Sequence, residues 1–441
     1  MRNFTFKGLL LTAVFALLWS LTIQAAEDGL ITKQITIKLK EAGTLPDRID
    51  ASKKYLITNL KLVGEINGTD WKMIREMAGS NYNGYSTEGK LSTLDLSEAK
   101  IVKGGDSYYS GDNCYTSNDE IGEYAFHDCS GLTSLTLPAG ITSIGRSAFV
   151  GCSGLTSLNL PAGITSIGSS AFEGCSGLTS LTLPAGITSI GDDAFWGCSG
   201  LTSLTLPDGI TSIGDDAFWG CSGLTSLPLP ATITSIGNCA FYICSGLTSL
   251  TLPASISEIG DFAFSDCSGL TSLNLPDGIT SISDYAFSGC SGLTSLNLPA
   301  SIFEIGDFAF SDCSGLTSLT LPDGITEIGE YAFYQCSGLT SIYVYAEKVP
   351  KIYSSTFSEC DTKKCTVYVP MGNHDDYRLS YFGYFENIVE FDPTGIDKTT
   401  TSTDVEEVSR YSVNGQRLVG PTKGLNIVKY SDGGVKKVAV E

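Results

Sequence analysis

Fourteen cysteines are the most obvious chemical resource of this 441-residue chain, because thiols can form disulfides, bind metals or act as nucleophiles. Ten of them recur at one constant spacing, each three residues after a phenylalanine: Cys129, Cys152, Cys175, Cys198, Cys221, Cys244, Cys267, Cys290, Cys313 and Cys336. Ten identical environments favour small buried thiols, although stacked thiols about 5 Å apart would also be within reach of one another. Four cysteines lie off this ladder: Cys114, Cys239, Cys360 and Cys365. The last two could close a small loop.

Catalytic chemistry finds little support elsewhere in the sequence. Only two histidines occur, His127 and His374, so a catalytic triad or a multi-histidine metal site has too few residues. The recurring Gly-Cys-Ser-Gly, as at Gly151 to Gly154, lacks the spacing of a nucleophile elbow and predicts a turn. We therefore expect no enzyme, no catalytic residue and no cofactor.

One acidic cluster is a candidate cation site. Asp192 and Asp193 stand one period of the cysteine ladder before Asp215 and Asp216, so stacked repeats would bring four carboxylates together. Oxygen ligands of this kind suit Ca²⁺. At about 5 Å in water, each carboxylate pair repels by only roughly 0.8 kcal/mol, so a plain acidic face is the favoured alternative.

These residues are positioned by a 23-residue unit, CSGLTSLxLPxxIxxIxxxAFxx, which occurs ten times between about residues 121 and 345. A constant period without insertions predicts a β-rich solenoid of stacked coils whose two ends must be capped. In Leu132–Pro138 apolar residues alternate, which predicts a strand that ends at the proline. A second short extended piece should end at Gly145, followed by a tight turn that buries Ala148, Phe149 and Cys152.

Binding residues are expected on solvent-facing positions, because only these can vary without disturbing the stack. After the ladder phenylalanine, three consecutive repeats carry Trp196, Trp219 and Tyr242, which predicts an aromatic strip about 10 Å long. Such a strip suits protein or glycan ligands. Alternatively, the rings pack over the turn and only cover the core.

A second candidate surface is the outer face of the predicted strands. Thr182 and Thr205 belong to a column of Thr and Asn that is interrupted at Pro228. This column could bind an extended polar partner, or it could simply be a solvated strand face.

Charge and the amino terminus restrict partners and location. The formal net charge of -21 argues against nucleic acid or an anionic membrane as a partner. Residues 1–26 have a basic start, an apolar core and small residues at their end, which predicts a cleaved signal peptide or, alternatively, a retained anchor. No other apolar run in the sequence is long enough for a membrane span, so we expect no transmembrane span in the mature chain.

The repeat motif LTSLxLP, followed by IGxxAFxxC, resembles the BspA-like leucine-rich repeat family of bacterial surface proteins. Residues 60–97 resemble the amino-terminal region of that family, and Thr366–Pro370 with the aromatic residues 381–385 resemble its closing unit. The resemblance implies a leucine-rich repeat array with parallel β ladders, capped at both ends. It also implies a secreted or cell-surface protein that adheres to host or bacterial molecules. No binding residue is carried over, because the family has no shared ligand motif.

The carboxy-terminal tail is a separate piece. Three strand patterns, at residues 411–418, 423–428 and 435–440, are similar to the sorting domain by which Gram-negative bacteria export and attach surface proteins. The segment is shorter than that domain, so a small β module is the alternative. This resemblance implies a location at the outer surface of a Gram-negative bacterium.

The expected organisation therefore has six parts: a signal peptide at 1–26, an amino-terminal capping region at 27–120, a ten-unit solenoid at 121–345, a carboxy-terminal capping unit at 346–392, a linker at 393–404 and a small β tail at 405–441. The expected function is adhesion to, or binding of, protein or glycan ligands through the solenoid face. The alternative is a spacer protein of the bacterial envelope that has no ligand of its own.

Overall fold

The computed structural model describes residues 29–111, 114–392, 407–412, 417–418, 423–430 and 435–440. The predicted signal peptide at 1–26 and the predicted linker at 393–404 lie outside the described residues. The chain divides into two compact units, Met1–Ile279 with Ser283–Leu293 and Thr280–Ile282 with Thr294–Glu441.

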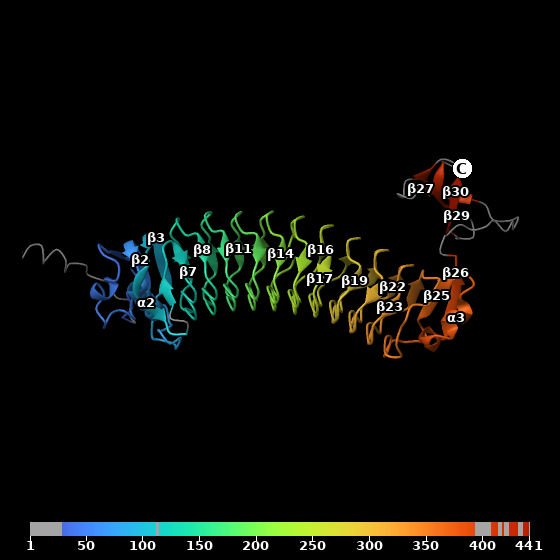
Figure 1. The fold of residues 1–441 in the computed structure, drawn as a ribbon, viewed down its shortest axis with the longest axis horizontal. Helices are drawn as coiled ribbons and strands as arrows, with labels where there is room; N and C mark the ends of the chain where they lie inside the picture. The colour runs from blue at the N-terminus through green and yellow to red at the C-terminus, as the bar shows by residue number, and fades with distance from the viewer. Residues whose placement is uncertain are drawn as a thin grey trace, which may run out of the picture. The chain divides into compact units, whose positions relative to one another are not determined.

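The first unit begins with a cap in which helix α2 (Gly68–Met77) covers the end of the repeat core (Figure 1). A capping box starts this helix: the Asn67 side chain accepts a backbone N–H of the first turn, and the Asp70 carboxylate accepts the N–H of Asn67. Trp71 is buried, and its ring centroid lies 5.2 Å from that of Phe126, the first ladder phenylalanine. The other cap elements are β1 (Ile35–Lys38), η1 (Leu45–Asp47), β2 (Asn59–Ile66), β3 (Thr93–Ile101), β4 (Gly104–Tyr109) and β5 (Cys114–Thr116).

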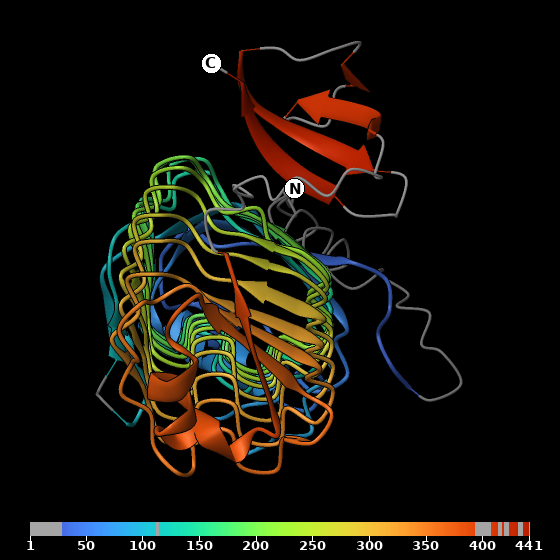
Figure 2. The same ribbon diagram turned by 90° about the vertical axis from the view of Figure 1, so that its right-hand side faces the viewer.

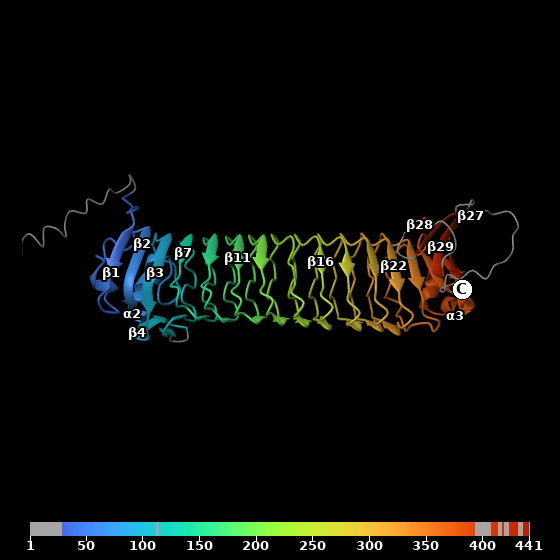
Figure 3. The ribbon, with the colours of Figure 1, turned by 90° about the horizontal axis from the view of Figure 1, so that it is seen from above.

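In the first unit, each repeat except the one with Pro228 contributes one strand of two or three residues to a parallel sheet on one side of the coil. The largest sheet has the order β1-β2-β3-β7-β9-β11-β13, so the cap and the repeats share one ladder (Figure 3). The ladder stops after β13, where the next repeat carries Pro228, which has no N–H to donate. The repeat strands of the first unit are β7 (Ser134–Thr136), β9 (Ser157–Asn159), β11 (Ser180–Thr182), β13 (Ser203–Thr205), β16 (Leu250–Thr251) and β18 (Leu273–Asn274).

A second set of short parallel strands forms where the sequence predicts an extended piece that ends at glycine. Successive strands pair without slippage, for example Ser189 with Ser212 and Ile190 with Ile213. In the first unit these strands are β6 (Glu120–Ile121), β8 (Ser143–Ile144), β10 (Ser166–Ile167), β12 (Ser189–Ile190), β14 (Ser212–Ile213), β15 (Ser235–Ile236) and β17 (Glu258–Ile259).

The coils of each unit wind around an interior (Figure 2), and the repeats fill it with apolar side chains from the same positions. In one repeat Leu201, Ile210, Ala217, Phe218 and Cys221 are all fully buried. Complete burial of one such large side chain contributes about 1.5–3 kcal/mol. These identical layers confirm the predicted solenoid of 23-residue units.

The ladder phenylalanines form a continuous stack along the core of the first unit. From Phe126 to Phe287, neighbouring ring centroids lie 5.1–5.4 Å apart and the ring planes differ by at most 13°. Because each ring contacts the one before and the one after it, no repeat completes its core without a neighbour.

The second unit is built from coils of the same kind and ends in its own cap. Helix α3 (His374–Arg378) and η2 (Tyr381–Tyr384) close the core, with the Phe382 and Phe385 rings 5.8 and 5.4 Å from the ring of Phe357. Its long sheet consists of β20 (Ser295–Asn297), β22 (Ser318–Leu321), β24 (Ser341–Val344), β25 (Thr366–Pro370) and β26 (Asn387–Phe391). Its short strands are β19 (Ser281–Ile282), β21 (Glu304–Ile305) and β23 (Glu327–Ile328).

The prediction that Cys360 lies off the cysteine ladder is wrong. Its Sγ lies 3.2 Å from the carbonyl oxygen of Phe333, the contact that ladder cysteines make, and Phe357 stacks on Phe333 at 5.3 Å. The unit from Cys336 to Cys360 is one residue longer than the units before it, so a search for a strict period misses it.

The tail contains an antiparallel sheet of order β28-β27-β29-β30. The first of the three predicted strand patterns, residues 411–418, contains the end of one strand and the whole of the next. The strands are β27 (Glu407–Ser412), β28 (Arg417–Leu418), β29 (Gly424–Tyr430) and β30 (Val435–Val440). Among all the residues that the structure describes, no helix is long and apolar enough to cross a membrane.

Candidate binding surfaces

The ladder cysteines lie beneath the turn between one repeat and the next. The Cys221 thiol donates to the carbonyl oxygen of Phe195 at 3.2 Å, and the same contact measures 3.0–3.3 Å from Cys152 to Cys290. Burial raises the pKa of the Cys198 and Cys244 thiols to about 12. A buried neutral thiol is a poor nucleophile, so this column is structural, and the predicted burial of the ladder is confirmed.

The turn itself is tied to its neighbours by backbone hydrogen bonds. The N–H groups of Asp193, Phe195 and Gly197 each donate to a carbonyl of the next repeat at 2.7–2.9 Å. Side chains in the turn are therefore not needed to hold the backbone in place. Their identities can change while the turn keeps its shape.

Two positions of each turn have left-handed backbone conformations. The first precedes the ladder alanine and is never glycine in the first unit, although φ lies between 51° and 58° at Tyr124, Ser147, Ser170, Asp193, Asp216, Cys239, Phe262 and Tyr285. The second position follows by four residues and is glycine in several repeats, as at Gly220. In the next repeat it is Ile243, a β-branched residue for which this conformation is strained.

The predicted aromatic residues lie on the outer side of these turns in the first unit. Trp196 is 39% exposed, and the Trp219 ring contacts the Tyr242 ring edge-on at 4.5 Å. Ile243 is also 39% exposed. We name this surface the turn edge and define it by six residues: Trp196, Trp219, Tyr242, Ile243, Phe262 and Tyr285.

The turn edge extends further than the sequence analysis predicted. The Tyr242 ring lies 6.4 Å from that of Phe262, which stacks on Tyr285 at 4.3 Å. Sequence reasoning missed Phe262 and Tyr285 because they occupy the column before the ladder alanine rather than the column after the phenylalanine. An alignment of all variable columns would have found them, since both columns project from one turn.

The other two predicted binding residues lie on the strand side. Thr182 and Thr205 are exposed and directly opposite each other in β11 and β13. Their hydroxyl groups lie side by side on the strand face. Among the contacts of the described residues, none joins these threonines to the predicted aromatic residues. Their role in binding stays a prediction.

The four aspartates of the candidate calcium site share the turns of Trp196 and Trp219. One oxygen each of Asp192 and Asp215 accepts the backbone N–H one repeat later, at 3.0 and 2.7 Å. Burial, and then repulsion by neighbouring carboxylates, raises the pKa of Asp193 and of Asp216. In the described part of the chain, no three Asp, Glu, His or Cys side chains are arranged to hold a metal ion. Calcium binding here stays a prediction.

Each histidine ring lies close to the carboxylate of the acidic residue that follows it in the sequence. His127 Nδ1 lies 2.9 Å from Asp128, and His374 Nδ1 lies 3.1 Å from Asp375. Burial lowers the pKa of His127, which favours the neutral ring. Among the hydrogen bonds of the described residues, none joins a histidine ring to a cysteine thiol or a serine hydroxyl that could serve as a nucleophile.

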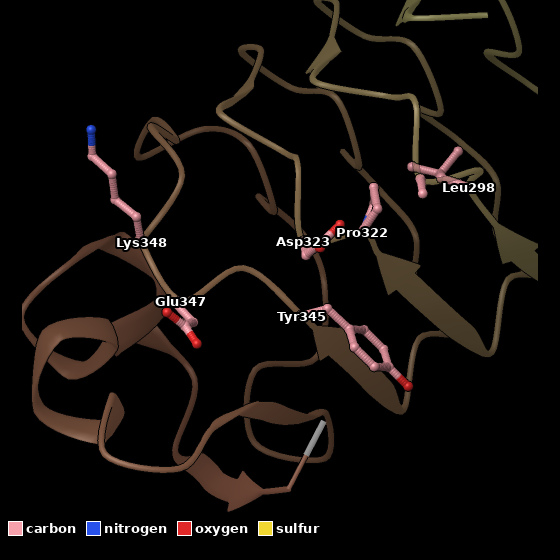
Figure 4. A pocket seen from close by; sticks show the side chains of 7 residues that line it. Leu298, Pro322, Asp323, Tyr345, Glu347 and Lys348 are labelled. Atoms are coloured by element: carbon pink, nitrogen blue, oxygen red, sulfur yellow. The ribbon is translucent and has the colours of Figure 1, made fainter. Parts of the chain in front are cut away.

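The second unit has a groove that sequence reasoning did not identify. It lies where the strands β20, β22 and β24 end, has a volume of about 600 Å³, and is open to solvent (Figure 4). Tyr345, Pro322 and Leu298 lie beside one another at the strand ends, whereas Lys348 extends away from them (Figure 4). Tyr345 is 36% exposed and contacts Phe391 edge-on at 5.2 Å. The signal in the sequence was an aromatic residue directly after a strand.

A family model described as the BspA type leucine rich repeat region matches residues 119–248 and 234–364, which together are more than half of the chain. The chain belongs to the BspA-type leucine-rich repeat family. The predicted family is thereby confirmed. BspA-type proteins are cell-surface proteins and typically bind ligands rather than catalyse reactions.

Several solved structures resemble this BspA-type chain. A leucine-rich repeat protein from Bacteroides ovatus is 25% identical over 70% of this chain and 88% of that chain, with a TM-score of 0.46. A leucine rich cell surface protein from Faecalibacterium prausnitzii is 26% identical over 71% and 88%, with a TM-score of 0.37. A T. pallidum leucine-rich repeat protein is 35% identical over 36% and 78%, with a TM-score of 0.35. Among proteins of curated function, none matches the chain.

Proposed function

We propose that this BspA-type protein is exported to the outer surface of a Gram-negative bacterium and adheres to host or bacterial surface molecules through the turn edge. Residues 1–26 would direct export, and the β tail would serve attachment or sorting. The ligands would be proteins or glycans, and the protein would have no enzymatic activity.

The observation that supports this role is the exposure of large apolar side chains on a turn that does not need them. Trp196 and Ile243 are each 39% exposed, and the turn backbone is held by inter-repeat hydrogen bonds. Aromatic residues that are clustered and partly exposed are typical of binding hot spots. The strained backbone of Ile243 also supports a binding role for this surface, because backbone strain in proteins is concentrated at functional sites.

The test is binding of the purified full-length protein to arrays of host matrix proteins, bacterial surface proteins and glycans. We expect saturable binding that the triple substitution Trp196→Ala, Trp219→Ala, Tyr242→Ala weakens at least tenfold, because each truncated anchor costs about 1 kcal/mol or more. The matched control removes two exposed rings from the carboxy-terminal cap, Tyr381→Ala and Tyr384→Ala, and should leave binding unchanged.

The alternative is a spacer protein that projects another module and has no ligand of its own. If the native protein bound none of the molecules on the arrays, this result would support the spacer role and contradict the adhesin role. Binding that survives the triple substitution in a folded variant would show that Trp196, Trp219 and Tyr242 only cover the core.

A further inference from the structure

The charge of the repeats is almost entirely of one sign. Residues 121–345 contain 19 Asp and Glu residues but a single Lys or Arg, which is Arg146. Its guanidinium is engaged near the start of the array, 3.7 Å from Glu123 and over the ring of Tyr124. The repeats therefore supply no further Lys or Arg to the carboxylates of the turn edge.

Carboxylates and aromatic rings occupy two neighbouring columns of the same turns. Asp193 stands three residues before Trp196, and Asp216 three residues before Trp219, in turns that the backbone fixes. Tyr242 is adjacent to a third carboxylate: burial, and then Asp266, raises the pKa of its phenol. A cation at this surface would meet ring faces and carboxylates together.

One oxygen of the Asp216 carboxylate lacks a partner among the described residues. Its Oδ1 atom is buried and accepts no hydrogen bond from any described residue. The negative charges of Asp193 and Asp215 raise the pKa of Asp216, because they make its ionised form less favourable. The Cys239 thiol is a weak donor that lowers this pKa, but the net pKa of Asp216 is still raised. A positively charged group placed beside the partly exposed carboxylates of Asp193 and Asp216 would relieve this crowding of negative charges.

We propose that the partner of the turn edge is a cationic, arginine-rich polypeptide segment, whose guanidinium groups pair with Asp193 and Asp216 and lie over Trp196, Trp219 and Tyr242. Arginine fits this surface better than lysine, because its planar group both stacks on aromatic faces and forks onto carboxylates. This inference rests on the proposed function and names the class of partner.

The test uses two synthetic peptides with the full-length protein, one of alternating arginine and glycine and one with citrulline in place of arginine. Citrulline keeps the size of the side chain and removes its charge. We expect the arginine peptide to bind at least tenfold more tightly than the citrulline peptide. We also expect its affinity to fall at least tenfold between about 50 mM and 500 mM salt, because salt screens exposed charges.

The matched variants each remove two negative charges. Asp193→Asn, Asp216→Asn removes the two carboxylates that would pair with the guanidinium groups, and asparagine tolerates the left-handed conformation that both positions require. Asp208→Asn, Asp277→Asn neutralises two exposed carboxylates that follow the strand proline instead. We expect the first pair to weaken arginine-peptide binding about tenfold and the second less than twofold.

Three results would overturn the inference. Equal losses in both pairs would show only a general attraction to a negative protein. Equal binding of the citrulline peptide would show that charge is not recognised. Binding of calcium, abolished by the Asp193→Asn, Asp216→Asn pair in a protein that ignores the arginine peptide, would make the cluster a metal site. In each case adhesion through the aromatic residues could still be observed on the arrays, so the two proposals fail separately.

Discussion

In the first unit, backbone hydrogen bonds link neighbouring repeats on both the strand side and the turn side, but the two sides differ in backbone geometry and in the residues that they expose. On the strand side, backbone ladders require regular extended geometry, and the exposed positions are small polar residues such as Thr182 and Thr205. On the turn side, backbone bonds also link neighbouring repeats, yet two positions of each turn are left-handed and the exposed residues range from Asp192 to Trp196. The strand side is uniform because its geometry selects its residues, whereas the turn side is diverse because its backbone is held independently of its side chains.

The two sides also differ in the chemistry beneath them. Leu204 lies under the strand and cannot ionise, while Cys221 lies under the turn and donates a hydrogen bond to the preceding repeat. Of these two buried side chains, only the one under the turn can lose a proton. Raising the pH should therefore destabilise the packing on the turn side but not that on the strand side.

The largest expected effect is the loss of stability at alkaline pH. The pKa of Cys198 and of Cys244 is raised from 9.0 to about 12 in the folded protein, so the unfolded chain releases these protons first. The contribution of the two protonated thiols to the free energy of unfolding is fully present below about pH 9 and is lost as the pH rises toward 12. Between these values, each thiol lowers the free energy of unfolding by about 1.4 kcal/mol per pH unit. Urea unfolding measured at intervals from pH 7.5 to 10.5 checks this slope.

A cysteine-depleted variant isolates the contribution of the thiols from that of other alkaline groups. Cys198→Ala, Cys244→Ala should reduce the slope by about 2.8 kcal/mol per pH unit, whatever its effect on stability at neutral pH. An unchanged slope would show that these thiols are not protected from ionisation.

The next effect compares the same left-handed turn position in two adjacent repeats. Ile243→Gly should raise the free energy of unfolding by about 1 kcal/mol, because glycine adopts the left-handed conformation without strain. Gly220→Ile should lower it by about 2 kcal/mol, although a Cβ there would have room, with its nearest neighbour, Gly197 Cα, at 3.9 Å. Thermal or urea unfolding measures both.

The same pair of variants sharpens the proposed role of the turn edge. If Ile243 is kept for binding, Ile243→Gly should be more stable and bind more weakly than the native protein. A variant that gains stability and keeps full binding would assign no function to the strained residue.

The smallest effect is expected on the strand side. Thr182→Ala, Thr205→Ala removes two exposed hydroxyl groups and should change the free energy of unfolding by less than about 0.5 kcal/mol per site. Binding to the array ligands should also stay unchanged. A substantial loss of binding would move the site from the turn side to the strand column, where the sequence analysis also placed a candidate surface.

The period and alternation of the sequence predicted the solenoid, both kinds of strand and the buried cysteine ladder, because these features repeat in register. The left-handed turn positions were not predicted, since Ser147 and Phe262 are not residue types that signal this conformation. Cys360 was missed because one inserted residue breaks the period. The turn edge was only partly predicted, because Trp219 and Phe262 occupy different columns that meet only when the turn folds.

Strict register between neighbouring repeats has a consequence for how such a protein can evolve. Ser180 pairs with Ser203, and Ser189 with Ser212, so one whole unit can replace, precede or follow another without a seam. Recombination between segments that encode such units would add, delete or reorder them, and units without a proline at the position of Pro228 would keep the same backbone pairing. Each event changes the order of rings and carboxylates in the turns, so the gene could vary the proposed recognition surface by rearranging whole units rather than by accumulating point mutations in one fixed site.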